Sequence, residues 1–187
     1  MRNATDRAAR TRARLAACAL DLFEQHGFEA TTTVQIAAAA GVSEMTLFRH
    51  FPTKDQLVTG DPYDPAIAEV VAAQPASMPP LARASAGVRT AWARLPEPET
   101  GDVRRRVRIV ASTPSLIAAM HAGTRATEDA IAHALIGGGA SGRDARIAAA
   151  ALLAALTAAL LDWAETDDGT LGEAIVSALD VLDGDTP

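Results

Sequence analysis

Apolar residues recur along this chain at spacings of three and four, the period of an α-helix with one buried face. The first such stripe is followed by His26 and Gly27, a pair typical of a helix end. We therefore expect a helix that buries one row of side chains, namely Leu15, Cys18, Ala19, Leu22 and Phe23.

Two short helices and a tight turn are predicted directly downstream. Thr32 and Gln35 have the spacing of a capping box, so a helix is expected to begin near Thr33. Gly41 suits the left-handed residue that ends a helix, and Ser43 is a good N-cap for the next one. The pattern is that of a helix-turn-helix.

The second short helix has an inward and an outward face. Leu47 and Phe51 lie one turn apart and pack inward, and Pro52 blocks continuation. The side chains left facing outward are Glu44, Met45, Thr46, Phe48 and His50. A helix, a tight turn and a second helix form the arrangement that places a recognition helix in the major groove of DNA.

The remaining pattern predicts further helices and no strand. Thr53 with Gln56 reads as another capping box, which opens a helix at Lys54, and Asp64 with Pro65 reads as an N-cap and first helical residue after an interruption at 60–65. The helices expected beyond this point cover 66–73, 80–95, 102–112, a segment opening at Pro114, 142–165 after Ser141, and a last segment after the Thr170–Glu173 capping box. The fold class is therefore all-α, with a helix-turn-helix domain at 1–57 and a second helical domain at 58–187.

Net charge becomes informative only when the chain is divided. The 187 residues together carry −6, which argues against a general nucleic-acid binder. Residues 1–54 hold seven Arg and Lys against five Asp and Glu, a net +2, whereas 55–187 hold ten against eighteen, a net −8. The basic end thus coincides with the helix-turn-helix. Its first residues form either an arm for DNA or a solvated tail, and they include Arg2, Arg7, Arg10, Arg12 and Arg14.

Cysteine usage and hydropathy bear on the compartment. Cys18 is the one cysteine of the chain, so no disulfide framework is expected, which fits a reducing cytoplasm. No apolar run has the flanks and length of a signal peptide or a membrane span. The run at 147–161 is short and is bounded by Arg146 and Asp162, so we expect a cytoplasmic protein without a membrane partner.

From Ala19 to Leu57 the chain resembles the N-terminal domain of TetR-family transcriptional regulators. The resemblance implies phosphate contacts from Thr32, Ser43, Thr46, His50 and Lys54, and base contacts from Thr33, Glu44, Met45 and Phe48. Two positions depart from the family pattern. Phe48 replaces the usual Tyr and loses a hydroxyl, and Met45 replaces a small residue, so a helical adaptor that has lost DNA binding stays an alternative.

The last two helices are expected to pair with those of a second copy. Alanine faces allow close helix approach, and the leucines offer apolar area. The candidate residues are Ala148, Ala151, Ala155, Ala158, Leu152, Leu153, Leu156, Leu160 and Trp163. In the TetR family two C-terminal helices dimerise, which implies a homodimer on a palindromic operator. The alternative is that these helices only close the monomer core.

The middle helices would hold a small-molecule effector, as the family resemblance implies. Candidate lining residues, which are equally plausible as core, are Trp92, Leu116, Ile117 and Met120. The run at 61–68 and the arginines at 104–108 are similar to ligand domains of the mycofactocin-system regulator, which implies a long-chain acyl-CoA-like effector. Arg105 and Arg108 would then pair with its phosphates, or else form a solvated helix face.

No pattern indicates catalysis, a cofactor or a metal. His26, His50, His121 and His133 are scattered, and no nucleophile elbow accompanies Ser112 or Ser115. A small hydrolase is therefore the weakest alternative. The sequence predicts a homodimeric one-component regulator, with repression as the family default and release by an apolar or amphipathic ligand.

Overall fold

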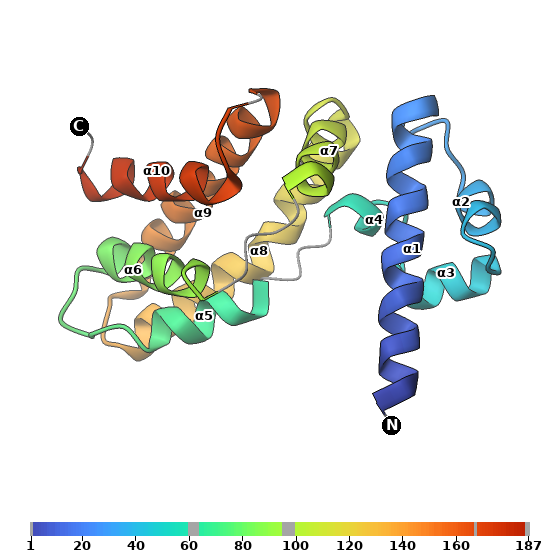
Figure 1. Ribbon diagram of the computed structural model, residues 1–187. Coiled ribbons are helices and arrows are strands. Elements are labelled where there is room, and N and C mark those ends of the chain that lie inside the picture. Colours follow the sequence, from blue (N-terminus) through green and yellow to red (C-terminus); the bar gives the residue numbers. More distant parts are fainter. Residues whose placement is uncertain (1, 60–63, 95–99, 167, 186–187) are drawn as a thin grey trace. The chain divides into compact units, whose positions relative to one another are not determined.

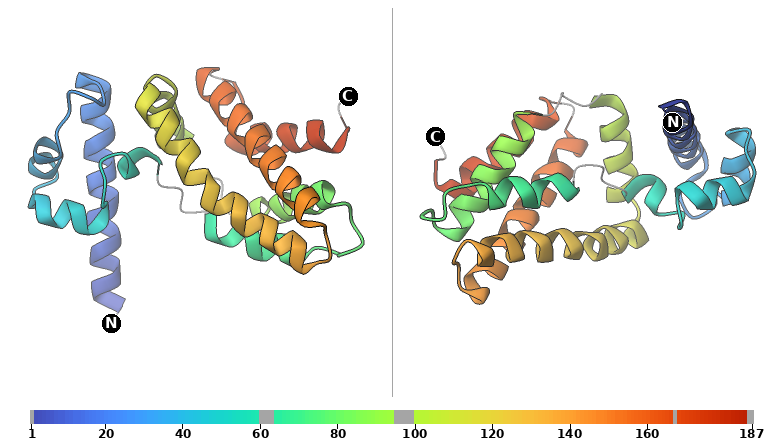
Figure 2. Two further views of the ribbon diagram at one scale, coloured as in Figure 1. Left: turned by 180° about the vertical axis from the view of Figure 1, so that it is seen from behind. Right: turned by 90° about the horizontal axis from the view of Figure 1, so that it is seen from below.

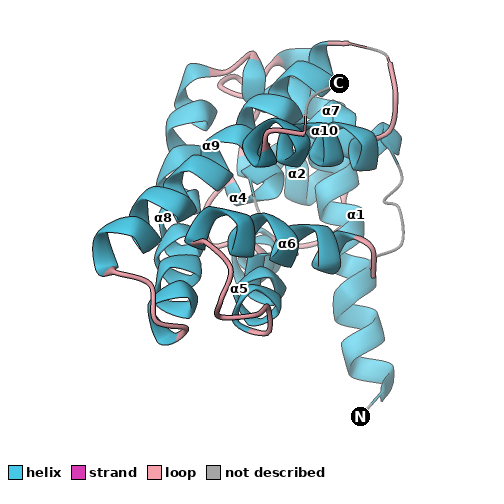
Figure 3. Ribbon diagram, turned by 90° about the vertical axis from the view of Figure 1, so that its left-hand side faces the viewer, coloured by secondary structure: helices cyan, strands magenta, loops and turns pink. Residues whose placement is uncertain are grey.

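The structure is a computed structural model that describes residues 2–59, 64–94, 100–166 and 168–185. Every regular element in these ranges is a helix (Figure 3), as the absence of strand patterns predicted. The described chain forms two compact units. Unit 1 contains Met1–Gly60 and Arg105–Ala119, and unit 2 contains Asp61–Arg104 and Met120–Pro187. The division into domains after residue 57 stays a prediction.

Unit 1 is built on one long helix. Helix α1 (Arg2–His26) carries α2 (Thr33–Ala39) and α3 (Glu44–His50) on one side, with the short α4 (Gln56–Thr59) also against it (Figure 1). The predicted stripe on α1 is confirmed, with Leu15, Ala19 and Phe23 buried and Cys18 and Leu22 half-buried. Its core is completed by Leu20, Ile36, Ala37, Leu47, Phe51 and Leu57.

The predicted start of α4 is wrong. The helix begins at Gln56 instead of Lys54, and residues 52–54 form a bend in which Thr53 is exposed and caps nothing. The Leu57 N–H donates to the Lys54 carbonyl at 3.2 Å, which closes a tight first turn. The Lys54 ammonium lies 4.1 Å from the centre of the Phe28 ring. A local capping pattern cannot reveal this tertiary contact of Lys54.

Unit 2 is a bundle of α5 (Asp64–Ala72), α6 (Pro80–Trp92), part of α8 (Pro114–Gly137), α9 (Gly142–Glu165) and α10 (Leu171–Asp183). Helix α7 (Thr100–Ala111) and α8 each contribute residues to both units. Figure 2 shows α10 crossing α9, with α5 and α6 side by side. A Cβ at Gly87 would lie 2.5 Å from Val71 Cγ2, so glycine permits the close contact of α5 with α6.

Most helix ends in unit 2 lie within a few residues of their predicted places. The Ser141 cap of α9 and the Thr170–Glu173 capping box of α10 are confirmed. Helix α5 begins at Asp64 rather than Ala66, α7 at Thr100 rather than Asp102, and α6 ends at Trp92 rather than residue 95. Of the predicted interruption at 60–65, residues 60–63 lie outside the described residues, and Asp64 and Pro65 already belong to α5.

Helix α9 has the predicted bounds and contains the apolar run at 147–161. Among the described helices it is the one long and apolar enough to cross a membrane by length and composition, and 28% of its most apolar window is buried. This is weak evidence for a span, because core helices of soluble proteins have the same length and composition. Ala148, Leu152 and Trp163 close the core of unit 2, while Leu156 and Leu160 are half-buried and Ala158 is exposed.

Candidate nucleic-acid interface

The turn between α2 and α3 forms as its sequence predicts. Thr32 and Gln35 form both halves of a capping box at the start of α2. Gly41 has φ +63°, and the Val42 N–H donates to the Ala37 carbonyl at 2.9 Å, which ends α2 in a left-handed turn. The Ser43 hydroxyl then caps α3 by accepting from the Thr46 N–H. These local bonds fix how α3 leaves the turn.

The outward face of α3 carries unusually exposed apolar side chains. Met45 is 82% exposed and Phe48 is 42% exposed, whereas Leu47 between them is fully buried. The prediction that Met45 and Phe48 face solvent is therefore confirmed. Their position beside hydroxyl and charged groups is suited to the mixed polar and methyl edges of a DNA major groove.

The other predicted DNA residues divide by their contacts. The hydroxyls of Ser43 and Thr46 are hydrogen-bonded to each other, with 3.0 Å between the two oxygens. This bond fixes the positions of both side chains at the start of α3. Thr33 donates from its hydroxyl to the carboxylate of Glu44, which joins the first residues of α2 and α3. Thr32 is exposed and also serves as the α2 cap.

A basic groove of about 810 Å³ separates the N-terminal half of α1 from the turn and α3. Its lining includes Arg7, Arg10, Arg14, Arg49 and the half-buried His50, together with the hydroxyls of Ser43 and Thr46. Arginines and hydroxyls in a concave surface are suited to phosphate oxygens. Sequence reasoning identified the α1 arginines but missed Arg49, whose exposure follows from its place between the inward residues Leu47 and Phe51.

Two cations of this region contact aromatic rings. The Arg12 guanidinium donates to the His50 carbonyl at the end of α3 and lies 4.1 Å from the centre of the Phe51 ring. Burial lowers the pKa of the half-buried Lys54 ammonium, and the charge of Glu29 opposes this shift. Arg12 therefore fixes the end of α3 against α1, a role that its place in the arginine-rich segment did not indicate. The side chain of Arg2 lies outside the described residues.

The predicted effector residues fall in both units. Leu116, Ile117, Arg105 and Arg108 lie in unit 1, and the half-buried Trp92 and Met120 lie in unit 2. Leu116 is buried, Ile117 is half-buried and Arg108 is exposed.

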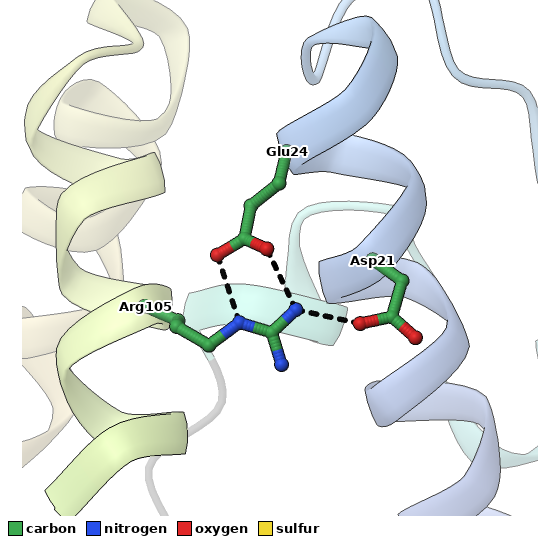
Figure 4. Close-up of polar contacts among 3 residues, drawn as sticks. All are labelled: Asp21, Glu24 and Arg105. Carbon is green, nitrogen blue, oxygen red and sulfur yellow. Dashed lines mark hydrogen bonds and ion pairs between the residues drawn. The ribbon is translucent and has the colours of Figure 1, made fainter.

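Arg105 makes an ion-pair cluster inside unit 1 (Figure 4). Its guanidinium donates to both carboxylate oxygens of Glu24, at 2.8 and 2.7 Å, and to Asp21 at 2.6 Å. The hydrogen bond from Arg105 lowers the pKa of Glu24. Ser115, at the start of α8, donates to Glu29 at 2.6 Å. Arg105 thus joins α7 to α1 and is already paired with two carboxylates.

Comparisons with known proteins agree with this geometry. Residues 15–59 match the TetR family of bacterial regulatory proteins, and residues 78–187, more than half of the chain, match the MftR C-terminal domain. The chain belongs to the TetR family. It is a transcriptional regulator whose N-terminal helices form the family's helix-turn-helix DNA-binding domain.

Two curated regulators are similar to it in sequence. TcmR of Streptomyces glaucescens is 35% identical over 116 residues, which cover 58% of this chain and 51% of TcmR. MftR of Mycobacterium tuberculosis, assigned to mycofactocin biosynthesis, is 29% identical over 169 residues, covering 88% of this chain and 85% of MftR.

Solved structures show the same fold. NalD of Pseudomonas aeruginosa, a repressor of the MexAB-OprM multidrug efflux pump, superposes with a TM-score of 0.61 at 20% identity. The superposition covers 96% of this chain and 97% of NalD.

Among the described residues, no group of three or more His, Cys, Asp and Glu side chains could hold a metal ion.

Proposed function

We propose that this TetR-family protein is a cytoplasmic repressor that binds a palindromic operator as a homodimer. The observation that carries the proposal is the basic groove beside the exposed face of α3. The groove offers Arg7, Arg14, Arg49 and His50 to phosphates, while α3 presents Met45 and Phe48 to base edges. NalD is itself a repressor, which supports this direction of regulation.

The roles of the predicted DNA residues follow from this arrangement. Thr32, Ser43, Thr46, His50 and Lys54 would contact phosphates, with Arg49 added from the groove lining. Met45 and Phe48 would contact thymine methyl groups, and Glu44 would accept from a base amino group. Phe48 lacks the hydroxyl of the family's usual Tyr, so one phosphate donor is absent at this position.

The dimer would form through α9 and α10. Several large apolar side chains of these helices are exposed in the single chain, with Ile147 at 60%, Val176 at 41% and Val181 at 61%. Their cover by a second copy would remove this apolar surface from water. A homodimer with two-fold symmetry would present two α3 helices to two half-sites about one helical turn apart.

The effector is proposed to be a long-chain acyl-CoA or a similar amphipathic molecule. This class is what the resemblance to the mycofactocin-system regulator implies, and residues 78–187 match the MftR C-terminal domain. The acyl chain would supply most of the binding energy, at about 0.8 kcal/mol per buried methylene. Arg105 and Arg108 are the proposed partners of its phosphates, and Arg105 would have to leave Glu24 and Asp21 to take this role.

A two-stage experiment tests the proposal. Fragments of the source genome are first selected on the immobilised protein, and the selected operator is titrated by gel shift at several salt concentrations. The proposal predicts one palindromic sequence and an affinity that falls steeply with salt through counterion release. The complex is then titrated with acyl-CoAs of increasing chain length, which are expected to release the DNA where free CoA does not. Recovery of no common sequence would refute operator binding, and equal release by free CoA would refute the effector class alone.

A further inference from the structure

One hydrogen bond crosses the helix-turn-helix between two side chains that the TetR resemblance places near DNA bases. The Thr33 hydroxyl, on the first residue of α2, donates to Oε1 of Glu44, the first residue of α3, at 2.5 Å. Both residues are half-buried. The two are eleven positions apart, so the contact depends on the folded turn.

This bond is not needed to hold α2 against α3. The turn is already fixed by the left-handed Gly41, the bond from Val42 to Ala37 and the Ser43 cap. Buried Ile36 and Leu47 supply the apolar contact of the two helices with unit 1. The effect of the Thr33 bond therefore falls on the Glu44 side chain itself.

A glutamate on a helix surface has three rotatable side-chain bonds, and an ionised carboxylate is an acceptor only. Thr33 occupies one position on Oε1 and so limits the rotamers of Glu44. Among the described residues the Glu44 carboxylate has no other hydrogen bond or ion pair, which leaves Oε2 for a partner outside the chain. Because the Thr33 proton is already donated, Thr33 has no donor left for a base.

The partner must be a donor. In the major groove only the amino groups of cytosine and adenine donate, while guanine and thymine edges present acceptors that repel a carboxylate. A carboxylate with one free oxygen makes a single bond, which suits cytosine N4; adenine is read by paired donor and acceptor groups.

We propose that Thr33 sets the base preference of this regulator as a positioning residue, by holding Glu44 so that its Oε2 accepts from cytosine N4. Thr33 does not contact the base. The inference rests on the proposed function, since it names how one position of the operator half-site is read.

The experiment compares operators selected from randomised duplexes by the wild type and by four variants. They are Thr33→Val, which removes the donor at nearly constant shape, Thr33→Ser, which restores a hydroxyl, Glu44→Gln, and the double variant Thr33→Val/Glu44→Gln. Thr124→Val, which removes a hydroxyl in unit 2, is the matched control. Competition titrations then measure the affinity ratio of cytosine to each other base at every position, and thermal unfolding confirms that each variant is folded.

The wild type is expected to prefer cytosine at one position per half-site by roughly ten- to hundredfold. Glu44→Gln abolishes this preference, and Thr33→Val reduces it severalfold at the same position, with Thr33→Ser and Thr124→Val close to wild type. In the Glu44→Gln background, Thr33→Val has no further effect, because the pair acts as one unit.

An unchanged preference in Thr33→Val, or a change at a position that Glu44→Gln leaves intact, overturns the inference while operator binding stands. A wild type that selects no sequence overturns the proposed function and this inference together. A Thr33→Val variant that weakens binding to all sequences equally identifies a structural bond, and this outcome also contradicts the positioning role.

Discussion

Helices α3 and α9 both expose apolar side chains, but in different settings. On the seven-residue α3, Met45 and Phe48 stand between hydroxyls and the charges of Glu44 and Arg49. On the 24-residue α9, exposed Ile147 and Ala158 belong to a helix that is apolar over most of its length. Isolated apolar groups among donors fit a wet, charged groove, whereas a continuous apolar helix fits another helix. The difference supports the proposal that α3 contacts DNA and that α9 contacts a second copy of the chain.

The largest expected effect comes from placing a charge on the apolar helix. Ala158 is exposed in the single chain, so Ala158→Glu leaves the unfolding of unit 2 unchanged but buries an unpaired carboxylate in the dimer. The dimer is expected to weaken by at least about 3 kcal/mol, roughly a hundredfold, and operator affinity falls with it. Sedimentation velocity measures the dissociation.

Ala126→Glu, on an exposed position of α8, is the control and stays dimeric. Val176→Glu places the charge on α10 and repeats the effect if both helices form the interface. A dimer that tolerates both Ala158→Glu and Val176→Glu would move the interface away from α9 and α10.

A smaller effect on operator affinity is expected from removing an arginine of the basic groove. Arg49→Ala removes one proposed phosphate contact and should weaken binding to every sequence by a similar factor, about tenfold. The slope of log affinity against log salt should become shallower by about one. Fluorescence anisotropy at several salt concentrations measures both values. Arg143→Ala, an exposed arginine of α9, should change neither, and a sequence-dependent loss in Arg49→Ala would contradict the phosphate role.

A subtler change is expected at Met45. Because its side chain is 82% exposed, Met45→Ala should leave protein stability unchanged. The variant should lose about 1 kcal/mol of binding free energy on operators with a thymine at the contacted position, and little on operators without one. Competition between operators that differ only at that position measures the discrimination. An equal loss on both operators would show that Met45 acts on the docking of α3 instead.

The smallest effect concerns the acidic partners of Arg105. Arg105 holds the pKa of Glu24 below its usual range, so Glu24 stabilises unit 1 when ionised, and this contribution is lost as the pH falls through the lowered pKa. The three side chains are 32–59% exposed, so Glu24→Gln should cost under about 1 kcal/mol at neutral pH and less in acid. Thermal unfolding between pH 7 and pH 3 measures it. A cost that grows on acidification would contradict the assigned ion pair.

Local signals account for what the sequence predicted well. Three signals each act within a few residues: the capping box at Thr32, the N-cap at Ser43 and the left-handed Gly41. The turn and the outward face of α3 could therefore be predicted from the sequence. The TetR resemblance added the expected partner of each residue, phosphate or base. The same reasoning placed α10 from its Thr170–Glu173 box.

Contacts between distant residues could not be predicted in this way. The groove that includes Arg49 needs the geometry of α1, and the bond of Thr33 to Glu44 needs the folded turn. The sequence predicts Arg105 to be a phosphate ligand or a solvated charge. Its actual partners, Asp21 and Glu24, lie more than eighty residues away and cannot be inferred from a local pattern. The local capping pattern places Lys54 at the start of a helix, because the contact of Lys54 with Phe28 is equally non-local.

The most direct test of the division between α3 and α9 is the stoichiometry of DNA binding on a full operator and on a single half-site. Sedimentation of the labelled duplexes with the wild type and with Ala158→Glu gives the mass and affinity of each complex. We predict two chains on the full palindrome, bound far more tightly than a half-site, and a loss of this advantage in Ala158→Glu. One chain bound equally tightly to a half-site, or an Ala158→Glu variant that still binds as a pair, would contradict these assignments.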